Sequence, residues 1–302
     1  MVRTVLSLIA LFSLVVVSGC TSPFGGGGDA GATGTSQGLN VEYVQTSYKV
    51  TYSGETIGVE AKIQNLGDQN IEHVTAKPIY LPWAGFNYVQ EAYDLARPNP
   101  EVGRQGGIHI FRWPAVTVAH VDKQETFPVG VRFYYDYSTE TRAQVFAISA
   151  TRYKGLQETG APLPMAKTIS NTNGPIRVDV LIDEVIIIPS SGSRKVPVSL
   201  KFQNTGTGYP QAYSDNARNF VIDSVMIDSQ NTGGMYISDY GSCTGNIPMR
   251  GGSFGECVLF LEVPPSTTDE IIADLRITST YTYAVEGKSQ ITVNPDLEEQ
   301  LS

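Results

Sequence analysis

One pattern occurs twice in this chain, as VEAKIQNLG at 59–67 and as VSLKFQNTG at 198–206. In each copy apolar and polar residues alternate, which predicts a β-strand with one face on a core. Each strand then runs into Asn-X-Gly. This predicts a turn, because Asn and Gly tolerate the positive φ that many turns require. The repeat therefore predicts two copies of one β-rich unit.

A second match lies near the end of each copy. VRFYYDYSTETRAQVFAI at 131–148 parallels LRITSTYTYAVEGKSQITV at 275–293. Each stretch contains a strand rich in tyrosine and β-branched residues, a polar segment, and another alternating strand. That order predicts a terminal β-hairpin in each unit.

The segment between the copies, 155–175, is rich in Gly, Pro, Asn and Thr and lacks alternation, so it marks a boundary. We predict an all-β protein with a β-sandwich in each copy. The predicted organisation is a first domain at 39–160, a linker at 161–175, a second domain at 176–294 and an acidic tail at 295–302.

One aromatic segment, about 83–108, has no counterpart in the second copy and reads as an insertion in the first domain. Residues 87–97 predict a short helix that ends before Pro98. Exposed aromatic side chains form binding platforms because they offer large, stiff contact areas. The alternative is that they cap the first sandwich as core. The candidate binding residues in and beside the segment are Trp83, Phe86, Tyr88, Tyr93 and Trp113.

The N-terminus has the pattern of an export signal. Arg3 precedes a mostly apolar run at 5–17, which is short for a membrane span and typical of a signal peptide. Val17-Ser18-Gly19-Cys20 follows and resembles the lipobox of prokaryotic lipoproteins. The resemblance implies that residues 1–19 are removed and that Cys20 carries lipid. The alternative is an ordinary secreted protein.

After Cys20 the chain is rich in glycine through residue 38, a composition typical of a flexible tether. The repeated strand-Gln-Asn-X-Gly opening and the Tyr-rich closing stretch resemble immunoglobulin-like modules of archaeal and bacterial cell-surface lipoproteins, loosely grouped as cell-adhesion-related. This resemblance implies tandem immunoglobulin-like sandwiches and a cell-surface setting. It implies no catalytic residue.

The other two cysteines, Cys243 and Cys257, flank a glycine-rich loop. An exported protein meets an oxidising compartment, so we predict a disulfide between them. A structural zinc site is the weaker alternative, because it needs four ligands.

Charge and motifs argue against several function classes. The formal net charge of −9, with no basic patch, disfavours nucleic-acid binding. His73, His109 and His120 lack metal-ligand spacing. Ser214-Asp215-Asn216 matches one β-lactamase element, but its partner motifs are absent from the sequence, so we predict a polar turn. We expect Asp215, Asp223, Asp228 and Asp239 to be solvated rather than to bind Ca²⁺.

These observations predict no enzyme, no cofactor and no metal. The expected protein is held by lipid on Cys20 at the extracellular face of the cytoplasmic membrane. There it acts as a structural or interaction module for adhesion or envelope assembly, with envelope proteins or its own copies as partners. One alternative is a carbohydrate or small-ligand binder that uses the aromatic insertion, with Trp83 and Trp113 stacking on sugar rings. An unrecognised hydrolase is the least favoured class.

Overall fold

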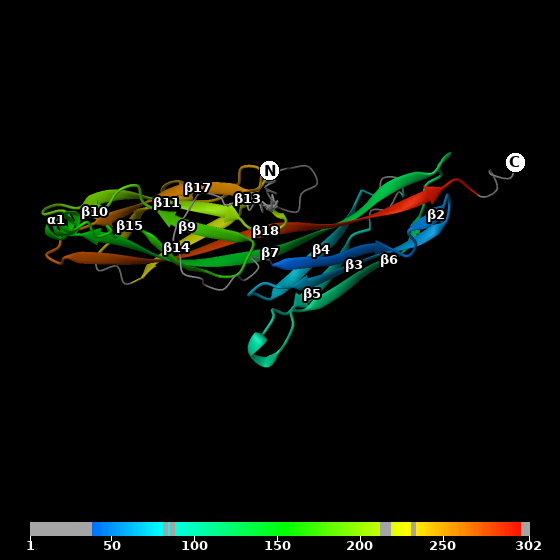
Figure 1. Ribbon diagram of the computed structural model, residues 1–302, viewed down its shortest axis with the longest axis horizontal. Helices are drawn as coiled ribbons and strands as arrows, with labels where there is room; N and C mark the ends of the chain where they lie inside the picture. Colours follow the sequence, from blue (N-terminus) through cyan, green and yellow to red (C-terminus); the bar gives the residue numbers. More distant parts are fainter. Residues whose placement is uncertain (1–37, 81–83, 85–87, 212–218, 231–233, 297–302) are drawn as a thin grey trace, which may run out of the picture. The chain divides into compact units, whose positions relative to one another are not determined.

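The computed structural model describes residues 38–80, 84, 88–211, 219–230 and 234–296. They belong to one compact unit, Thr35–Ser302. The fold is built of several β-sheets, which confirms the all-β prediction (Figure 1). The described helices are α1 (Ala150–Thr159) and two 3₁₀ turns, Pro100–Val102 and Gly241–Cys243. None of these described helices has the length and apolar character of a membrane span.

The strands form one large sheet and three smaller ones. The large sheet has the central order β12 (Tyr209–Pro210), β18 (Glu270–Asn294), β7 (Glu125–Ile148), β4 (Ile71–Ile79) and β5 (Gln90–Leu95). Four more strands pair with β7 or β18, namely β2 (Val50–Tyr52), β8 (Lys167–Asn171), β10 (Ile186–Ile187) and β14 (Ser224–Gln230).

The smaller sheets supply the second layers. A three-stranded sheet has the order β1 (Leu39–Thr46), β3 (Thr56–Asn65) and β6 (Ile108–Thr117). A four-stranded sheet has the order β15 (Tyr236–Asp239), β17 (Phe254–Val263), β11 (Arg194–Asn204) and β9 (Ile176–Leu181). A short pair joins β13 (Val221–Ile222) to β16 (Ile247–Pro248).

The longest feature is an antiparallel ladder between β7 and β18. All 24 residues of β7 pair with residues of β18, from Glu125 opposite Val293 to Ile148 opposite Glu270. The predicted terminal hairpins at 131–148 and 275–293 are therefore wrong. Each stretch stays extended through its polar middle, and the two stretches pair with each other.

The ladder joins the two copies of the repeat. β4 and β2 pair with one half of it, at residues 130–135 of β7 and 292–294 of β18. β14 and β10 pair with the other half, at residues 274–280 of β18 and 147–148 of β7. The described parts of 39–160 and 176–294 thus share one continuous sheet (Figure 1).

Alternation along the ladder separates a core face from an outer face. On β7 the odd-numbered residues from Val129 to Ala147 are buried, whereas most even-numbered ones reach solvent. Phe133 of β7 lies 5.6 Å, between ring centroids, from Phe111 of β6. The three-stranded sheet therefore packs on the first half of the ladder as a second layer.

The two Asn-X-Gly turns are built alike. The Asn65 amide nitrogen donates to Gln69 O (2.8 Å) and Leu95 O (2.9 Å), and its Oδ1 accepts from Gly67 N (3.0 Å). In the second copy Asn204 donates to Gly208 O (2.8 Å) and Gly252 O (2.9 Å) and accepts from Gly206 N (3.1 Å). Each amide holds three backbone groups.

The sequence pattern predicts positive φ angles in these two turns, and this prediction is wrong. None of Asn65, Gly67, Asn204 and Gly206 has a positive φ. The asparagines are needed for their amide hydrogen bonds. The glycines are needed because a Cβ on Gly67 would overlap the Tyr137 hydroxyl, and one on Gly206 the Tyr283 hydroxyl.

The predicted helix at 87–97 is also wrong, because the described part of this segment contains β5. Its buried residues, Ala92 and Leu95, lie three apart, which resembles helical spacing. Asp94 between them has φ 58°. A residue with left-handed backbone conformation inside a strand interrupts the alternation of buried and exposed side chains. The buried residues on either side of it are then spaced as they would be in a helix.

The segment expected to be a linker has regular structure. β8 lies within 161–175 and pairs with residues 141–144 of β7. Side chains of β8 also accept hydrogen bonds from backbone N–H groups of β9, an edge strand of the four-stranded sheet. Val178 N donates to Asn171 Oδ1 (2.9 Å), and Val180 N donates to Thr168 Oγ1 (3.1 Å). The segment thus closes one side of the second half.

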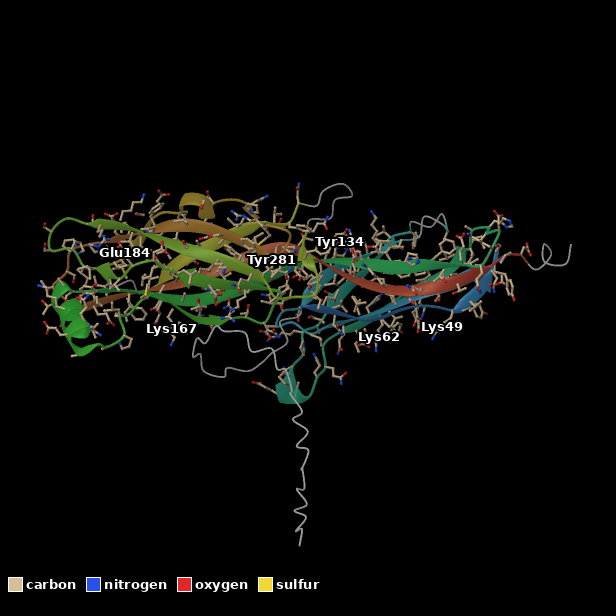
Figure 2. All side chains as sticks on the ribbon, turned by 45° about the horizontal axis from the view of Figure 1, so that its top comes forward. Lys49, Lys62, Tyr134, Lys167, Glu184 and Tyr281 are labelled. Carbon is tan, nitrogen blue, oxygen red and sulfur yellow. A yellow bond between two sulfur atoms is a disulfide. The ribbon has the colours of Figure 1, made fainter. Side chains whose placement is uncertain are left out.

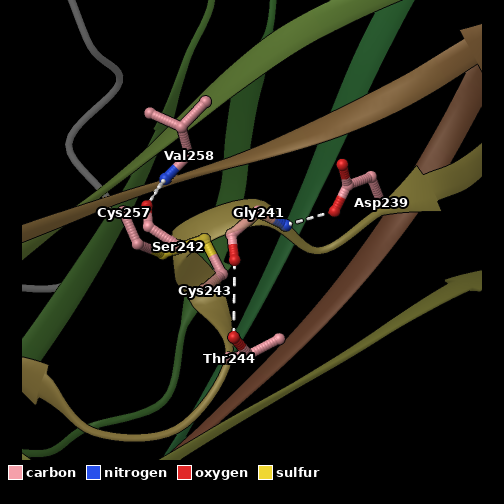
Figure 3. The surroundings of a disulfide bond; sticks show 7 residues. All are labelled: Asp239, Gly241, Ser242, Cys243, Thr244, Cys257 and Val258. Atoms are coloured by element: carbon pink, nitrogen blue, oxygen red, sulfur yellow. Dashed lines mark hydrogen bonds between the residues drawn. A yellow bond between two sulfur atoms is a disulfide. The ribbon is translucent and has the colours of Figure 1, made fainter.

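The predicted disulfide between Cys243 and Cys257 is confirmed (Figure 3). Both cysteines are buried, and Val258 N next to Cys257 donates to Ser242 Oγ (2.9 Å). A loop of this size gives about 3 kcal/mol in the chain-entropy description. The bond fastens the segment after β15 to β17.

We expect Asn65→Ala to lower the free energy of unfolding by about 2–3 kcal/mol, because it leaves buried backbone groups without a partner. Equilibrium urea unfolding measures the change. The matched control is Asn70→Ala, which removes one exposed bond from Arg97 N and is expected to cost less than about 1 kcal/mol. Equal losses in the two variants would contradict this role for Asn65.

Candidate functional site

The structure divides the predicted aromatic residues between surface and core. Tyr88 and Tyr93 are 64% and 61% exposed, whereas Trp113 is 1% exposed. The Trp113 indole N–H donates to Tyr88 O (2.8 Å), so the buried ring fixes the backbone beside the exposed one. Trp83 and Phe86 lie outside the described residues. Of the predicted aromatic binding residues that the structure describes, Tyr88 and Tyr93 are therefore the exposed ones.

Pairing between β4 and β5 positions Tyr93. His73 lies directly opposite Tyr93 in this pair, and the ring centroids are 5.0 Å apart. The Tyr93 hydroxyl donates to Glu91, which raises the pKa of Tyr93, and His73 Nε2 lies 3.6 Å from Glu91 Oε1. One strand pair thus presents an aromatic ring, an imidazole and a carboxylate together.

A groove lies beside this group on the outer face of the large sheet. We name it the β5 groove; it has a volume of about 360 Å³ and is lined by His73, Thr75, Val89, Glu91, Tyr134, Tyr135, Asp136 and Thr282. A neighbouring hollow of about 400 Å³ shares His73 and Asp136. The β5 groove therefore reaches from β5 to the centre of the ladder.

Two carboxylates meet around Thr282 at that centre. The Thr282 hydroxyl donates to Asp136 Oδ1 (2.8 Å), and Thr282 N donates to Asp223 Oδ2 (2.8 Å). Burial raises the pKa of Asp223 above its ordinary value, and the charge of Asp136 adds to the effect. This end of the β5 groove is acidic.

Ion pairs fasten the outer face on both sides of this centre. In the first half Glu286 accepts from Arg132 (2.5 Å), Tyr209 (2.8 Å) and Lys288 (3.0 Å). Burial alone would raise the pKa of Glu286, but these hydrogen bonds lower it. In the second half Glu140 lies between Arg276 (2.5 Å) and Arg142 (3.1 Å), and their hydrogen bonds lower its pKa.

Four buried tyrosines face one another on the core side of the same centre. Tyr135 lies opposite Tyr283, and Tyr137 opposite Tyr281; Figure 2 labels Tyr281 of this cluster. Their hydroxyls bind the backbone of both copies. Tyr135 accepts from Leu39 N (3.0 Å), Tyr281 from Ile176 N (3.3 Å), Tyr137 from Asp68 N (3.0 Å) and Tyr283 from Gly208 N (3.1 Å).

Burial raises the pKa of all four tyrosines. The pKa of Tyr137 rises to about 12, and those of Tyr135, Tyr281 and Tyr283 are also raised. The neutral hydroxyl is therefore the form that the folded protein stabilises.

The remaining sequence candidates are dispersed. His109 is half-buried with its ring 4.5 Å from Phe111, and burial lowers its pKa. Asp239 pairs with Lys195 (2.9 Å). Cys20 and the Ser214-Asp215-Asn216 segment lie outside the described residues. Within the described ranges, no three His, Cys, Asp or Glu side chains are placed to hold a metal ion.

Sequence reasoning missed the groove residues His73, Glu91 and Asp136, which come from three strands. Alternation in 131–148 already places Asp136 on the face opposite Tyr135 and Tyr137. Neither His73 nor Glu91 has such a signal, because β4 and β5 are brought together only by pairing.

Comparison with protein-family models finds no match for this chain. Comparison with curated protein sequences also finds no significant match. The groove and the ladder must therefore be interpreted from their own chemistry.

The raised tyrosine pKa values predict a loss of stability in alkali. Free tyrosine ionises near pH 10, so stabilisation from Tyr137 is complete below pH 10 and is lost as the pH rises through its folded pKa of about 12. Urea unfolding at a series of pH values measures this. The stability difference between the wild type and Tyr137→Phe should shrink above pH 10. A difference that stays constant across this pH range would contradict the assignment.

Proposed function

We propose that this protein is a lipid-anchored cell-surface protein that acts as a non-catalytic interaction module. In this proposal residues 1–19 are a signal peptide, Cys20 carries the lipid, and residues 20–38 tether the body to the extracellular face of the cytoplasmic membrane. The two copies of the repeat are tandem immunoglobulin-like sandwiches of the kind found in archaeal and bacterial surface lipoproteins. The sequence resemblance and the two-layered β-fold support this reading.

The observation that carries the proposal is the ladder between β7 and β18. A module that positions other molecules needs its parts held rigidly. Twenty-four consecutive residue pairs and the ion pairs around Glu286 and Glu140 hold the two repeats through a shared sheet. Independent domains joined by a linker would lack that restraint.

The β5 groove is the proposed contact surface for an envelope protein. Tyr88 and Tyr93 expose aromatic area, and Glu91 and Asp136 provide hydrogen-bond acceptors nearby. Aromatic anchors surrounded by polar groups are typical of protein contacts. The acidic end of the groove favours a partner segment that carries Lys or Arg.

A carbohydrate ligand is the second candidate, favoured by one observation. The exposed Tyr93 ring stands beside Glu91 and His73, and rings flanked by hydrogen-bonding groups suit the apolar faces and hydroxyls of sugars. Trp113 is buried, so in this alternative Tyr93 takes the stacking role.

The anchor is tested by Cys20→Ala. Without the lipid, the protein lacks the two or more acyl chains that stable anchoring needs, so it should leave the membrane fraction. Fractionation of cells and medium followed by immunoblotting measures the change, with Thr21→Ala as the neighbouring control. Cys20→Ala protein that stays in the membrane fraction would contradict the anchor.

The contact surface is tested by chemical cross-linking on intact native membranes, followed by mass spectrometry. Lys77 and Lys123 of the wild type should link to one recurrent envelope protein. We expect Tyr93→Ser to lower those links at least about tenfold, because a central aromatic anchor is worth roughly 1.4 kcal/mol or more.

The matched control for Tyr93→Ser is Tyr48→Ser. Both tyrosines are 61% exposed, but Tyr93 borders the groove through its contact with His73, whereas Tyr48 lines a different hollow. Links that survive in both variants would overturn the groove as the contact surface. Titration with oligosaccharides in a calorimeter separates the second candidate, which requires heat of binding that Tyr93→Ser removes.

A further inference from the structure

We propose that the two repeats are a strand-exchanged pair, and that a second copy of this chain can supply the exchanged strand. In a self-contained repeat the two ends of β7 would fold back on each other, as the sequence of 131–148 predicts. Here each end pairs instead with β18. This inference does not depend on the lipid anchor or on the β5 groove.

The ladder has two-fold character. Its pairing is centred on Asp136 opposite Thr282, and tyrosines face tyrosines on both sides of that pair. Tyr135 and Tyr281 each accept from the first strand of their own repeat, at Leu39 N and Ile176 N. Tyr137 and Tyr283 each bind the turn after the repeated Gln-Asn strand.

The neighbouring strands follow the same two-fold arrangement. β4 is antiparallel to β7 on one side of the centre, and β14 is antiparallel to β18 on the other. Parallel β2 pairs with the last residues of β18, and parallel β10 pairs with the last residues of β7. Each half of the ladder therefore offers an equivalent environment, as the two subunits of a symmetric swapped dimer do.

The residues at the centres of β7 and β18 keep both strands open. A tight hairpin needs residues that accept positive φ, usually Gly, Asn or Asp-Gly. The centres of the strands read Asp136-Tyr137-Ser138-Thr139 and Tyr281-Thr282-Tyr283-Ala284, and no positive φ occurs in either. Each strand end must therefore find its partner in another repeat.

The partner repeat need not belong to the same chain. Facing residues such as Thr126 and Thr292 are 166 apart in sequence, so the ladder is set by side-chain and backbone complementarity rather than by a short connection. The covalent link only raises the local concentration of β18. When many chains fold together, β18 of a second copy competes for β7.

Two single-cysteine chains test the exchange. Thr126 Oγ1 and Thr292 Oγ1 lie 3.2 Å apart on the exposed face of the ladder, so cysteines there are placed to cross-link. Full-length Thr126→Cys and Thr292→Cys chains, both also carrying Cys20→Ser, are unfolded together with the native disulfide intact, refolded and oxidised. Mass spectrometry then identifies the products.

The expected result is a disulfide-linked heterodimer joining residue 126 of one chain to residue 292 of the other, in a fraction that rises with protein concentration during refolding. Chains folded separately and then mixed should give no more product than a pairing of Thr126→Cys with Thr267→Cys, an exposed position outside the ladder. The double variant Thr126→Cys/Thr292→Cys must cross-link within one chain, which shows that the ladder has formed. Intrachain product in the double variant, with only background heterodimer at every concentration, would overturn the proposal.

Discussion

Backbone pairing of β7 with β18 along the whole of β7 holds both halves of the protein in one sheet. An antiparallel pair of this length needs lateral support on both sides and a covered face, because an isolated two-stranded ribbon is marginal in water. β4, β14, β2 and β10 supply the lateral support, and the three- and four-stranded sheets cover the core face. Neither repeat completes its own large sheet without the other.

The ladder also explains why chemistry differs between its two faces. Side chains alternate across a strand, so one face carries the tyrosine cluster and the other carries Glu140, Asp136 and Glu286. The tyrosine hydroxyls are satisfied by backbone groups that belong to both repeats. Burying hydroxyls without such partners would be costly, so the cluster favours one register over slipped ones.

This arrangement places the β5 groove where the repeats meet. The groove takes His73 from β4, Glu91 from β5, Asp136 from β7 and Thr282 from β18, which come from both halves of the sequence. A slip of the ladder by one residue would move Asp136 to the core and a tyrosine to the surface. The register of the ladder therefore determines which side chains line the groove.

Local alternation and the cysteine pair were sufficient to predict the two repeated strands, the turns that follow them and the disulfide, although the positive φ expected in those turns is absent. Sequence reasoning misassigned the turns in 131–148 and 275–293 and the helix at 87–97. Alternation says which face of a strand is apolar but not which strand lies beside it. The pairing of β7 with β18 cannot be read from local pattern, since the free energy that favours it comes from contacts between residues more than a hundred positions apart. The groove was beyond sequence reasoning for the same reason, because it exists only once that pairing is made.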